Sequence, residues 1–455
     1  MTAAIQKPII VWHRRDLRVA DNAALYHADK DGLAIPVFII DPFFFRENNE
    51  TNPDRIIFML ECLKDLDAHY KRIGSKLLIL YGDSVEVITN FAQKLSAKVY
   101  FNHDTNMPFG FERDAKVKMF SQFRGFNNDG IIRTKYSANE WAEYCNSYFQ
   151  SSQFSTPTNL KKHGFASTIT CDDVIAKYNI VAEKKYPYTG GYSYAKKRLI
   201  EFGIFLRKYP GSLSKPYLAE KYTSRLSAYF SFGAISLREV YDYINNLDQP
   251  SKTKLFYITR LFWHQHFTQR MQNFPKLTTH CINPSYELKF DELYEHNDEF
   301  INAWKEGRTG YPLIDASMRA LVMTGHISFR MRAMVASFFV YNLRQHWKIG
   351  ADFMHYHLID ADTAINYAQW QMQAGFISQH PIRLYNPTKQ IEDNDKDCLF
   401  IKKYVPQTRD LPIDFLKRDP NTTQQTLFGY SYIPPIVNFD ATAKWARTFY
   451  TNMRK

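Results

Sequence analysis

Residues 7–13 read KPIIVWH, a short apolar run rich in β-branched side chains. Three runs of the same kind follow: LAIPVFIID (33–41), KLLILYGD (76–83) and AKVYFNHD (97–104). Between the second and third runs, apolar residues recur at helical spacing over residues 54–74. Strand signals that alternate with helical signals predict a parallel sheet covered by helices. Ligands of such sheets bind beyond the carboxyl ends of the strands, but no G-x-G-x-x-G or Walker loop specifies a dinucleotide.

The chain after this α/β region changes character twice. Residues 151–164, SSQFSTPTNLKKHG, are polar and rich in Ser and Thr, as in a connector. From residue 189 onward the helical period dominates and strand-like alternation is scarce. We therefore predict a Rossmann-like α/β domain over residues 1–130, an inter-domain connector over 131–188 and an all-helical domain over 189–455.

The composition favours a large folded protein with a basic surface. The 455 residues are 45% hydrophobic and 16% aromatic, and Lys plus Arg outnumber Asp plus Glu by 58 to 46. The aromatic content fits either a large core or a platform for a planar ligand. A formal net charge of +12 suits a polyanionic partner such as nucleic acid, although many basic proteins never bind one.

The cysteines and the N-terminus exclude several classes of protein. The five cysteines are odd in number and form no C-x-x-C pair, which argues against a disulfide framework and a structural zinc site, so no metal is predicted. The first apolar run is too short for a signal peptide, and no apolar stretch approaches 18 residues. We expect a cytoplasmic protein with no membrane segment.

A cluster of hydroxyl side chains and one arginine marks the predicted start of a helix near residue 225. Thr223, Ser224, Arg225 and Ser227 stand together in KYTSRLSAYFSFGAIS. Hydroxyls, exposed N–H groups and an arginine form a suitable anion site. The alternative is an ordinary Ser/Thr N-cap.

Two arginines lie in an apolar helical run further along the chain. The spacing of residues 308–347 predicts two helices with a break near Thr324 and Gly325, and Arg330 and Arg332 lie in the second helix. A buried arginine needs a carboxylate or a phosphate, but both side chains could instead point into solvent.

The segment 359–371, IDADTAINYAQWQ, places polar groups among apolar and aromatic ones. If it is helical, Asp362, Asn366 and Trp370 recur at i, i+4 and i+8 and share one face. A carboxylate, an amide and an indole in one row suit a flavin ring, and Asp360 could neutralise a buried arginine. The alternative is an N-cap aspartate followed by a core asparagine whose hydrogen bonds are satisfied.

Taken together, these stretches resemble the DNA photolyase/cryptochrome family over nearly the whole chain, and in particular a divergent bacterial branch of it. The motifs that carry the resemblance are VWHRRDLRVADNAAL (11–25), TSRLSAYFSFGAIS (223–236), GRTGYPLIDASMRAL (307–321), FRMRAMVASFF (329–339), IDADTAINYAQWQMQAG (359–375) and RLYNPTKQ (383–390). The resemblance implies an N-terminal α/β domain, a long connector and a helical domain that binds FAD.

The resemblance also implies which residues hold the cofactor. The pyrophosphate would be bound by Thr223, Ser224, Arg225, Leu226 and Ser227. Tyr209 matches a further FAD contact. Arg332 would pair with Asp360 beside the flavin, Asp362 would lie against the isoalloxazine and ribose, and Asn366 would face flavin N5, where its type influences the favoured redox state.

Light-driven reduction of the flavin is implied to run through a chain of aromatic residues. Trp370 matches the residue nearest the flavin and Trp347 matches the middle residue, whereas the outermost position is Tyr294. Tyrosine is harder to oxidise unless it loses its proton, and another aromatic could substitute for it. The implied reaction is transfer of an electron from excited FADH⁻ to a pyrimidine dimer flipped out of UV-damaged DNA.

The residues implied to face DNA depart from the family pattern. Trp263 keeps a lesion-stacking position, but Arg260 replaces a usual Glu, Phe329 a usual Asn, Ala333 a usual Met and Met372 a second indole. Positions that match the DNA side of the family are Arg330, Arg383 and Gln390.

These departures leave three activities open: a photolyase for cyclobutane pyrimidine dimers, a cryptochrome-type blue-light sensor without repair activity, and a (6-4) photolyase. The iron–sulfur branch of the last is excluded, because it needs four cysteines in the helical domain and only Cys281 and Cys398 lie well inside it. The first activity is the one we predict. The family commonly carries a second, antenna chromophore of folate or deazaflavin type, and residues 102–114 match the antenna-side loop without specifying the molecule. We expect the protein to be a monomer.

Overall fold

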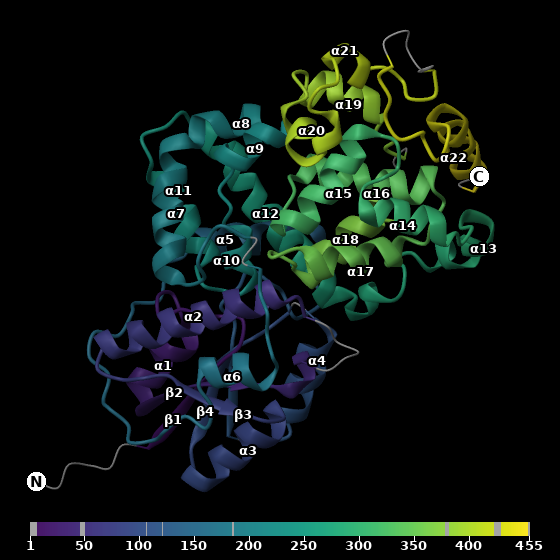
Figure 1. The fold of residues 1–455 in the computed structure, drawn as a ribbon. Helices are drawn as coiled ribbons and strands as arrows, with labels where there is room; N and C mark the ends of the chain where they lie inside the picture. Colours follow the sequence, from purple (N-terminus) through teal and green to yellow (C-terminus); the bar gives the residue numbers. More distant parts are fainter. Residues whose placement is uncertain are drawn as a thin grey trace, which may run out of the picture. The chain divides into compact units, whose positions relative to one another are not determined.

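The computed structural model describes residues 7–45, 51–105, 107–120, 122–183, 186–377, 382–422 and 429–453. The chain forms two compact units (Figure 1). The first comprises Met1–Ile204 and Ser224–Pro275, and the second comprises Phe205–Thr223 and Lys276–Lys455. The predicted boundaries at residues 130 and 188 follow sequence pattern rather than spatial contacts, and they stay a prediction.

The first unit is built on a five-stranded parallel sheet with the order β3-β2-β1-β4-β5. Its strands are β1 (Pro8–His13), β2 (Leu33–Ile40), β3 (Leu78–Tyr81), β4 (Lys98–Asn102) and β5 (Phe123–Phe126). The first four confirm the four predicted runs. The strand order reverses between β1 and β4, which is where ligands of open α/β sheets usually bind.

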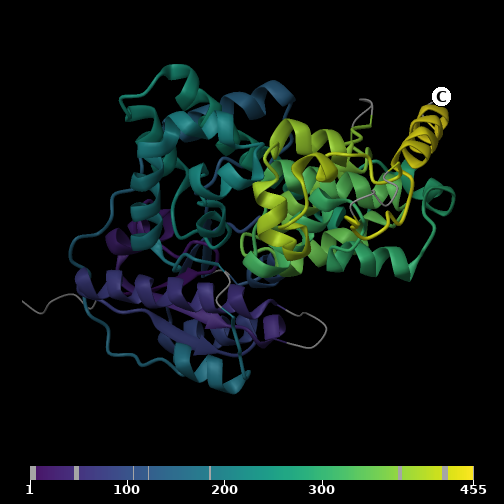
Figure 2. The same cartoon turned by 45° about the horizontal axis from the view of Figure 1, so that its top comes forward.

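Helices cover the sheet because each strand-to-helix connection returns the chain to a parallel start. They are α1 (Ala23–Asp31), α2 (Pro53–Arg72), α3 (Ser84–Leu95) and α4 (Pro108–Val117). Figure 2 shows the long helix α2, which confirms the helical period predicted for residues 54–74, running along the sheet. The central strands are buried almost throughout, which explains why they read as continuous apolar runs.

The rest of the first unit contains helices joined by irregular segments. Two helices lie inside the predicted connector, α5 (Ala138–Gln150) and α6 (Cys171–Lys177), and each begins with a capping box. The others in this unit are α7 (Tyr192–Phe205, whose last residue opens the second unit), α10 (Ser227–Ser231), α11 (Leu237–Asn246) and α12 (Ser251–Asn273).

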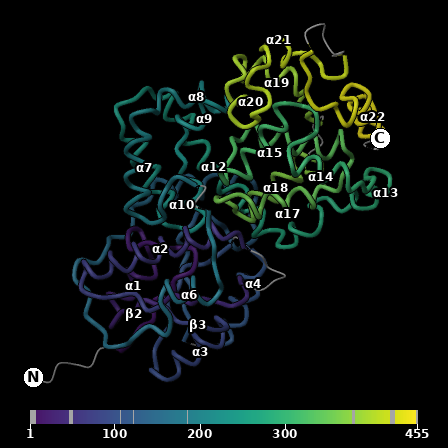
Figure 3. The backbone as a smooth tube through the Cα atoms, viewed as in Figure 1, coloured from purple at the N-terminus to yellow at the C-terminus, as the bar shows by residue number. Residues whose placement is uncertain are grey.

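The second unit contains helices and turns, with no strand among its described residues. The tube in Figure 3 follows the chain from one helix into the next. The helices are α8 (Tyr209–Ser212), α9 (Pro216–Tyr222), α13 (Phe290–Leu293), α14 (Asp298–Glu306), α15 (Pro312–Thr324), α16 (Phe329–Ser337), α17 (Trp347–His357), α18 (Thr363–Gln373), α19 (Pro387–Asn394), α20 (Leu399–Tyr404), α21 (Ile413–Leu416) and α22 (Phe439–Met453). A π-helical turn, Phe338–Asn342, follows α16 directly.

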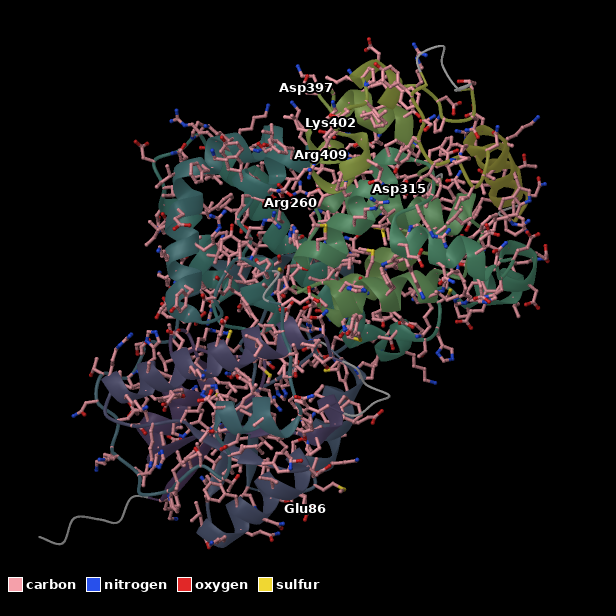
Figure 4. The ribbon with its side chains drawn as sticks, viewed as in Figure 1. Glu86, Arg260, Asp315, Asp397, Lys402 and Arg409 are labelled. Carbon is pink, nitrogen blue, oxygen red and sulfur yellow. The ribbon has the colours of Figure 1, made fainter. Side chains whose placement is uncertain are left out.

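The predicted break between two helices is confirmed. α15 ends at Thr324, and Gly325 has a φ of +65°, a left-handed conformation that favours glycine. At the other end of α15, the buried Asp315 (labelled in Figure 4) accepts hydrogen bonds from Thr309 N at 2.7 Å and from the Tyr432 hydroxyl at 2.7 Å. Burial raises the pKa of this carboxyl group, so these donors are needed to hold it inside.

All five cysteines are buried free thiols. Within the described ranges, no three or more His, Cys, Asp or Glu side chains gather as a metal site would require. A search of the helices in those ranges for one long and apolar enough to cross a membrane finds none.

Candidate cofactor and nucleic-acid sites

The phosphate segment, residues 223–227, precedes a helix that its own hydroxyl groups do not cap. The N-cap of α10 is Leu226, and no side chain makes the capping hydrogen bond. The Thr223 hydroxyl instead donates to Ala219 O at 2.6 Å, one turn earlier in α9. The residue at the N-cap position is thus a leucine and not a Ser or Thr, although Leu226 N donates to Ser224 Oγ at 3.4 Å.

Arg225 has the features of a residue held in place for a ligand. Its φ is +56°, a conformation that non-glycine residues adopt only where the surroundings impose it. Its Nε atom is buried and has no hydrogen-bond partner among the described residues. A buried guanidinium nitrogen without an acceptor fits an anion such as a pyrophosphate.

Two residues that the sequence did not single out fix the backbone of this segment. Arg198 Nε donates to Ser224 O at 2.9 Å, and the Tyr186 hydroxyl donates to Arg225 O at 3.1 Å. Arg198 lies in α7, and no sequence signal connects it to the Ser224 carbonyl, which is 26 positions further along the chain. Tyr209, the remaining predicted contact, is buried at the start of α8 in the second unit, and its role stays a prediction.

The ring segment, which we define as Arg332, Asp360, Asp362 and Asn366, lies entirely in the second unit. The predicted pair is confirmed: Arg332 Nη2 donates to both oxygens of Asp360, at 3.0 and 2.9 Å, and its Nε donates to Ile327 O at 2.9 Å. Asp360 is almost fully buried, whereas the Arg332 side chain is about one quarter exposed (26%). The arginine therefore neutralises a buried carboxylate and keeps one edge open.

Asp362 and Asn366 lie on one face of α18, as their spacing predicted. Asp362 is the N-cap, and its Oδ1 accepts from Ile365 N at 3.0 Å. Asn366 Nδ2 donates to Ala351 O at 3.0 Å, which directs the amide group with its oxygen away from that carbonyl. An acceptor oxygen beside flavin N5 would favour the form of the ring that carries a proton there. The N-cap aspartate and the hydrogen-bonded core asparagine of the alternative interpretation are thus both observed, and the same groups fit a flavin.

The two tryptophans of the predicted electron chain lie on α17 and α18, and Tyr294 directly follows α13. Trp370 and Trp347 are both buried, at 2% and 1% exposed. A Cβ at Gly350 would lie 2.3 Å from the Trp370 ring, so glycine is required for the indole to pack against α17. The Tyr294 hydroxyl is buried, and this burial raises the pKa of Tyr294 well above its usual value, although the nearby backbone amide of Trp347 acts in the opposite direction.

The predicted DNA-side residues are distributed over both units. On α12 in the first unit, Trp263 is 48% exposed and stacks on Phe267, and the Arg260 guanidinium (labelled in Figure 4) lies 5.0 Å from the centre of the Phe256 ring. In the second unit, Phe329 is 45% exposed at the start of α16. Both rings therefore have faces that are accessible to a ligand.

The remaining DNA-side residues surround Phe329 in sequence or lie further along the second unit. Arg330 is half-buried, with its guanidinium 5.4 Å from the centre of the Tyr385 ring and its Nε without a partner among the described residues. Arg383 is exposed, and Met372 and Gln390 are half-buried. Each of these four side chains is therefore at least partly exposed.

The carboxyl ends of β1 and β4 carry the segment predicted for an antenna chromophore. Arg14 follows β1, lies 4.9 Å from the centre of the Trp12 ring, and donates to Asp114 Oδ1 at 2.7 Å. Asp114 belongs to α4, within residues 102–114, of which Asn106 lies outside the described residues. Binding of a second chromophore here stays a prediction.

Comparison with known proteins agrees with this geometry. Residues 9–127 match the family model described as DNA photolyase, and residues 257–452 match the FAD binding domain of DNA photolyase. A deoxyribodipyrimidine photo-lyase of Synechococcus sp. is 28% identical over 98% of this chain and 97% of its own length. Cryptochrome-2 of Arabidopsis thaliana is 30% identical over 96% of this chain and 77% of its own length.

A solved structure extends the similarity to the whole fold. The archaeal photolyase of Sulfolobus tokodaii, whose crystal structure is described with two FAD molecules, has a TM-score of 0.81 and 28% identity. The alignment covers 98% of this chain and all of the archaeal chain.

A parallel α/β sheet unit followed by a helical FAD-binding domain defines a flavoprotein of the photolyase type. This chain belongs to the DNA photolyase/cryptochrome family.

Proposed function

We propose that this protein is a light-driven, FAD-dependent DNA repair lyase that splits cyclobutane pyrimidine dimers. The observation that carries the proposal is the exposed Trp263 ring on α12, one helical turn after Arg260. In the second unit, Phe329 is similarly exposed and directly precedes Arg330. Stacking on aromatic rings is how proteins bind bases that have left the duplex, and arginines bind the adjacent phosphates.

The flavin would be held at two segments of the chain. Arg225 and the uncapped start of α10 would bind the pyrophosphate, and the ring segment would bind the isoalloxazine. When bound in its reduced form, the flavin supplies an excited electron that opens the cyclobutane ring of the dimer. The Asn366 side-chain oxygen would accept a hydrogen bond from a proton-bearing nitrogen of the ring, and the Arg332–Asp360 pair would fix the position of that edge.

Arg260 and Arg330 supply the charge for binding the damaged strand. Arg260 lies one helical turn before Trp263 on α12, so both can face the same ligand. Arg330 has a buried Nε without a protein acceptor among the described residues, which a phosphate or a base carbonyl would satisfy. Positive charge of this kind binds DNA regardless of sequence.

The second candidate is a blue-light sensor without repair activity. The observation that favours it is Met372, a half-buried thioether at a position where family members that repair dimers have a second indole. With methionine there, a flipped-out base would stack on an aromatic ring on one side only. The same substitution leaves repair of the (6-4) lesion open.

One experiment separates these candidates. The purified protein is reduced chemically and illuminated with blue light in the presence of three oligonucleotides: one with a cyclobutane dimer, one with a (6-4) lesion and one undamaged. We expect restored thymines only from the dimer and only in the light. Unchanged lesions in both damaged strands, with the flavin still photoactive, would reject repair and support the sensor.

A further inference from the structure

Two tyrosines lie beside Trp347, the middle residue of the proposed electron chain, and only one of them can pass on its proton. The position that the family resemblance implies is Tyr294. The other is Tyr367, which lies on α18 one turn before Trp370. Oxidising a tyrosine makes its hydroxyl strongly acidic, so a tyrosine donates an electron readily only where a base takes the proton.

Tyr294 has no base hydrogen-bonded to its hydroxyl among the described residues. Its hydroxyl is buried and finds no acceptor among the described residues, and its ring contacts Phe290 and His346 at centroid distances of 5.2 and 4.8 Å. Removing an electron from Tyr294 would therefore leave a positive charge in a buried site with no hydrogen-bonded proton acceptor, which is costly.

Tyr367 has a base in place. Its hydroxyl donates to Asp352 Oδ1 at 2.6 Å, and its ring meets the Trp347 ring edge to face, with centroids 6.3 Å apart and an interplanar angle of 86°. The Asp352 side chain is 45% exposed, and its other oxygen accepts from Lys348 Nζ at 2.5 Å. The phenol is buried while its proton acceptor reaches water, so the proton has a route out of the protein.

Trp347 itself cannot release a proton. Its Nε1 is buried and has no acceptor among the described residues. An oxidised Trp347 therefore remains a radical cation, which is a stronger oxidant than the neutral radical. It returns to the neutral indole only by taking an electron from a neighbouring residue.

We infer that Tyr367 is the outermost electron donor of the chain and that Asp352 accepts its proton; the inference rests on the proposed function. Trp370 gives one electron to a light-excited oxidised flavin and takes one from Trp347. Tyr367 then gives one electron to Trp347, its O–H bond breaks, and the proton passes to the Asp352 carboxylate. The products are a neutral tyrosyl radical, a neutral carboxyl group and the restored indole.

A purely structural role for this hydrogen bond, joining α17 to α18, makes a different prediction. A hydrogen bond of the same kind joins the Tyr432 hydroxyl to the Asp315 carboxylate at 2.7 Å. Tyr432 is not one of the residues of the proposed electron-transfer route. Tyr432→Phe is therefore the matched control, since it removes an equivalent hydroxyl and hydrogen bond without touching the proposed route.

The test is electron paramagnetic resonance of the FAD-loaded protein, frozen under blue light after incorporation of ring-deuterated tyrosine to identify the radical. We expect a tyrosyl signal in the parent protein, in Tyr294→Phe and in Tyr432→Phe, and loss of that signal in Tyr367→Phe and Trp370→Phe. A signal that persists in Tyr367→Phe, or one that is lost in Tyr294→Phe alone, would overturn the inference.

Asp352→Asn keeps the Tyr367 phenol and tests the proton acceptor directly. We expect its tyrosyl yield to fall severalfold and the solvent isotope effect on radical formation in D₂O, present in the parent, to change. Equal yields and equal isotope effects in the two proteins would reject Asp352 as the acceptor. Circular dichroism and the flavin content of each variant show that it is folded.

The outcome is separable from that of the proposed function. A parent protein that repairs dimers when chemically reduced but forms no tyrosyl radical overturns this inference alone. A parent protein that forms the radical at Tyr367 and leaves dimers intact overturns the repair proposal and supports the donor.

Discussion

The residues proposed to contact the flavin ring and those proposed to contact DNA differ in how the protein holds them. The ring segment is bonded within its own unit: Arg332 to Asp360, Asp362 to the start of α18, and Asn366 to α17. On the DNA side, Trp263 and Phe329 are about half exposed. The ring segment is therefore organised before any ligand arrives, whereas the two DNA-side rings keep exposed faces that a ligand could cover.

The largest effect is expected from Asp360→Asn in the ring segment. The change leaves the Arg332 guanidinium without its carboxylate, and we expect a loss of about 2 kcal/mol of unfolding free energy, less than for a fully buried pair because Arg332 is partly solvated. Flavin content after purification should fall with it. Chemical denaturation and the absorbance of bound flavin measure the two effects.

The matched control for this change is an ion pair on the surface. Glu292→Gln disrupts the exposed pair of Lys289 and Glu292, which are 2.8 Å apart, and should cost at most about 0.5 kcal/mol. If the two variants lose the same stability, Arg332 and Asp360 are not the fixed pair described above.

Trp263→Ala tests the DNA side and is expected to have the next largest effect. Loss of one stacked base should weaken binding of dimer-containing DNA by about 1.5 kcal/mol, roughly tenfold, while stability changes by less than about 0.5 kcal/mol. Fluorescence anisotropy with a labelled oligonucleotide measures the affinity. Tyr194→Ala, which removes a tyrosine of similar exposure (45%) from α7, should leave the affinity unchanged.

Asn366→Ala gives a smaller change in stability and a qualitative change in the flavin. Loss of the hydrogen bond to Ala351 O should cost about 1 kcal/mol. The redox state of the flavin that accumulates under blue light should also differ from that of the parent protein, because the acceptor oxygen is gone. Identical absorption spectra throughout illumination would place Asn366 away from flavin N5.

Arg383→Ala is expected to have the smallest effect. An exposed arginine that contacts one phosphate contributes mainly counterion release, so the slope of log K against log[salt] should fall by about 1. Damaged and undamaged DNA should be affected equally. A loss confined to the damaged strand would mean that Arg383 contacts the lesion itself.

Sequence pattern was sufficient for the parts of the fold that are set by local physics. Buried strands appear as apolar runs, and Gly325 marks the end of α15 because its conformation favours glycine. β5 was missed because Phe123–Phe126 is a short edge strand that includes Arg124 and Gly125 and so lacks an apolar run. The capping boxes of α5 and α6 were readable in the predicted connector, where polar composition hid the helices.

The contacts that set the chemistry were less accessible from sequence. The pairing of Arg332 with Asp360 came from family resemblance, since no periodicity connects residues 28 positions apart. The bond from Tyr367 to Asp352 depends on how α17 packs against α18, and a lone Tyr and a lone Asp on two helices carry no signal of it. Sequence therefore pointed to the residues of the ring segment but not to Asp352, the proposed proton acceptor of Tyr367.

The most direct test of the account is the stoichiometry of FAD bound to the purified protein, measured by absorbance and by titration of the apoprotein. One FAD per chain is expected, with binding weakened in both Arg225→Ala and Asp360→Asn. A protein that stays colourless in excess FAD, or one whose FAD binding is unaffected by either change, would contradict it.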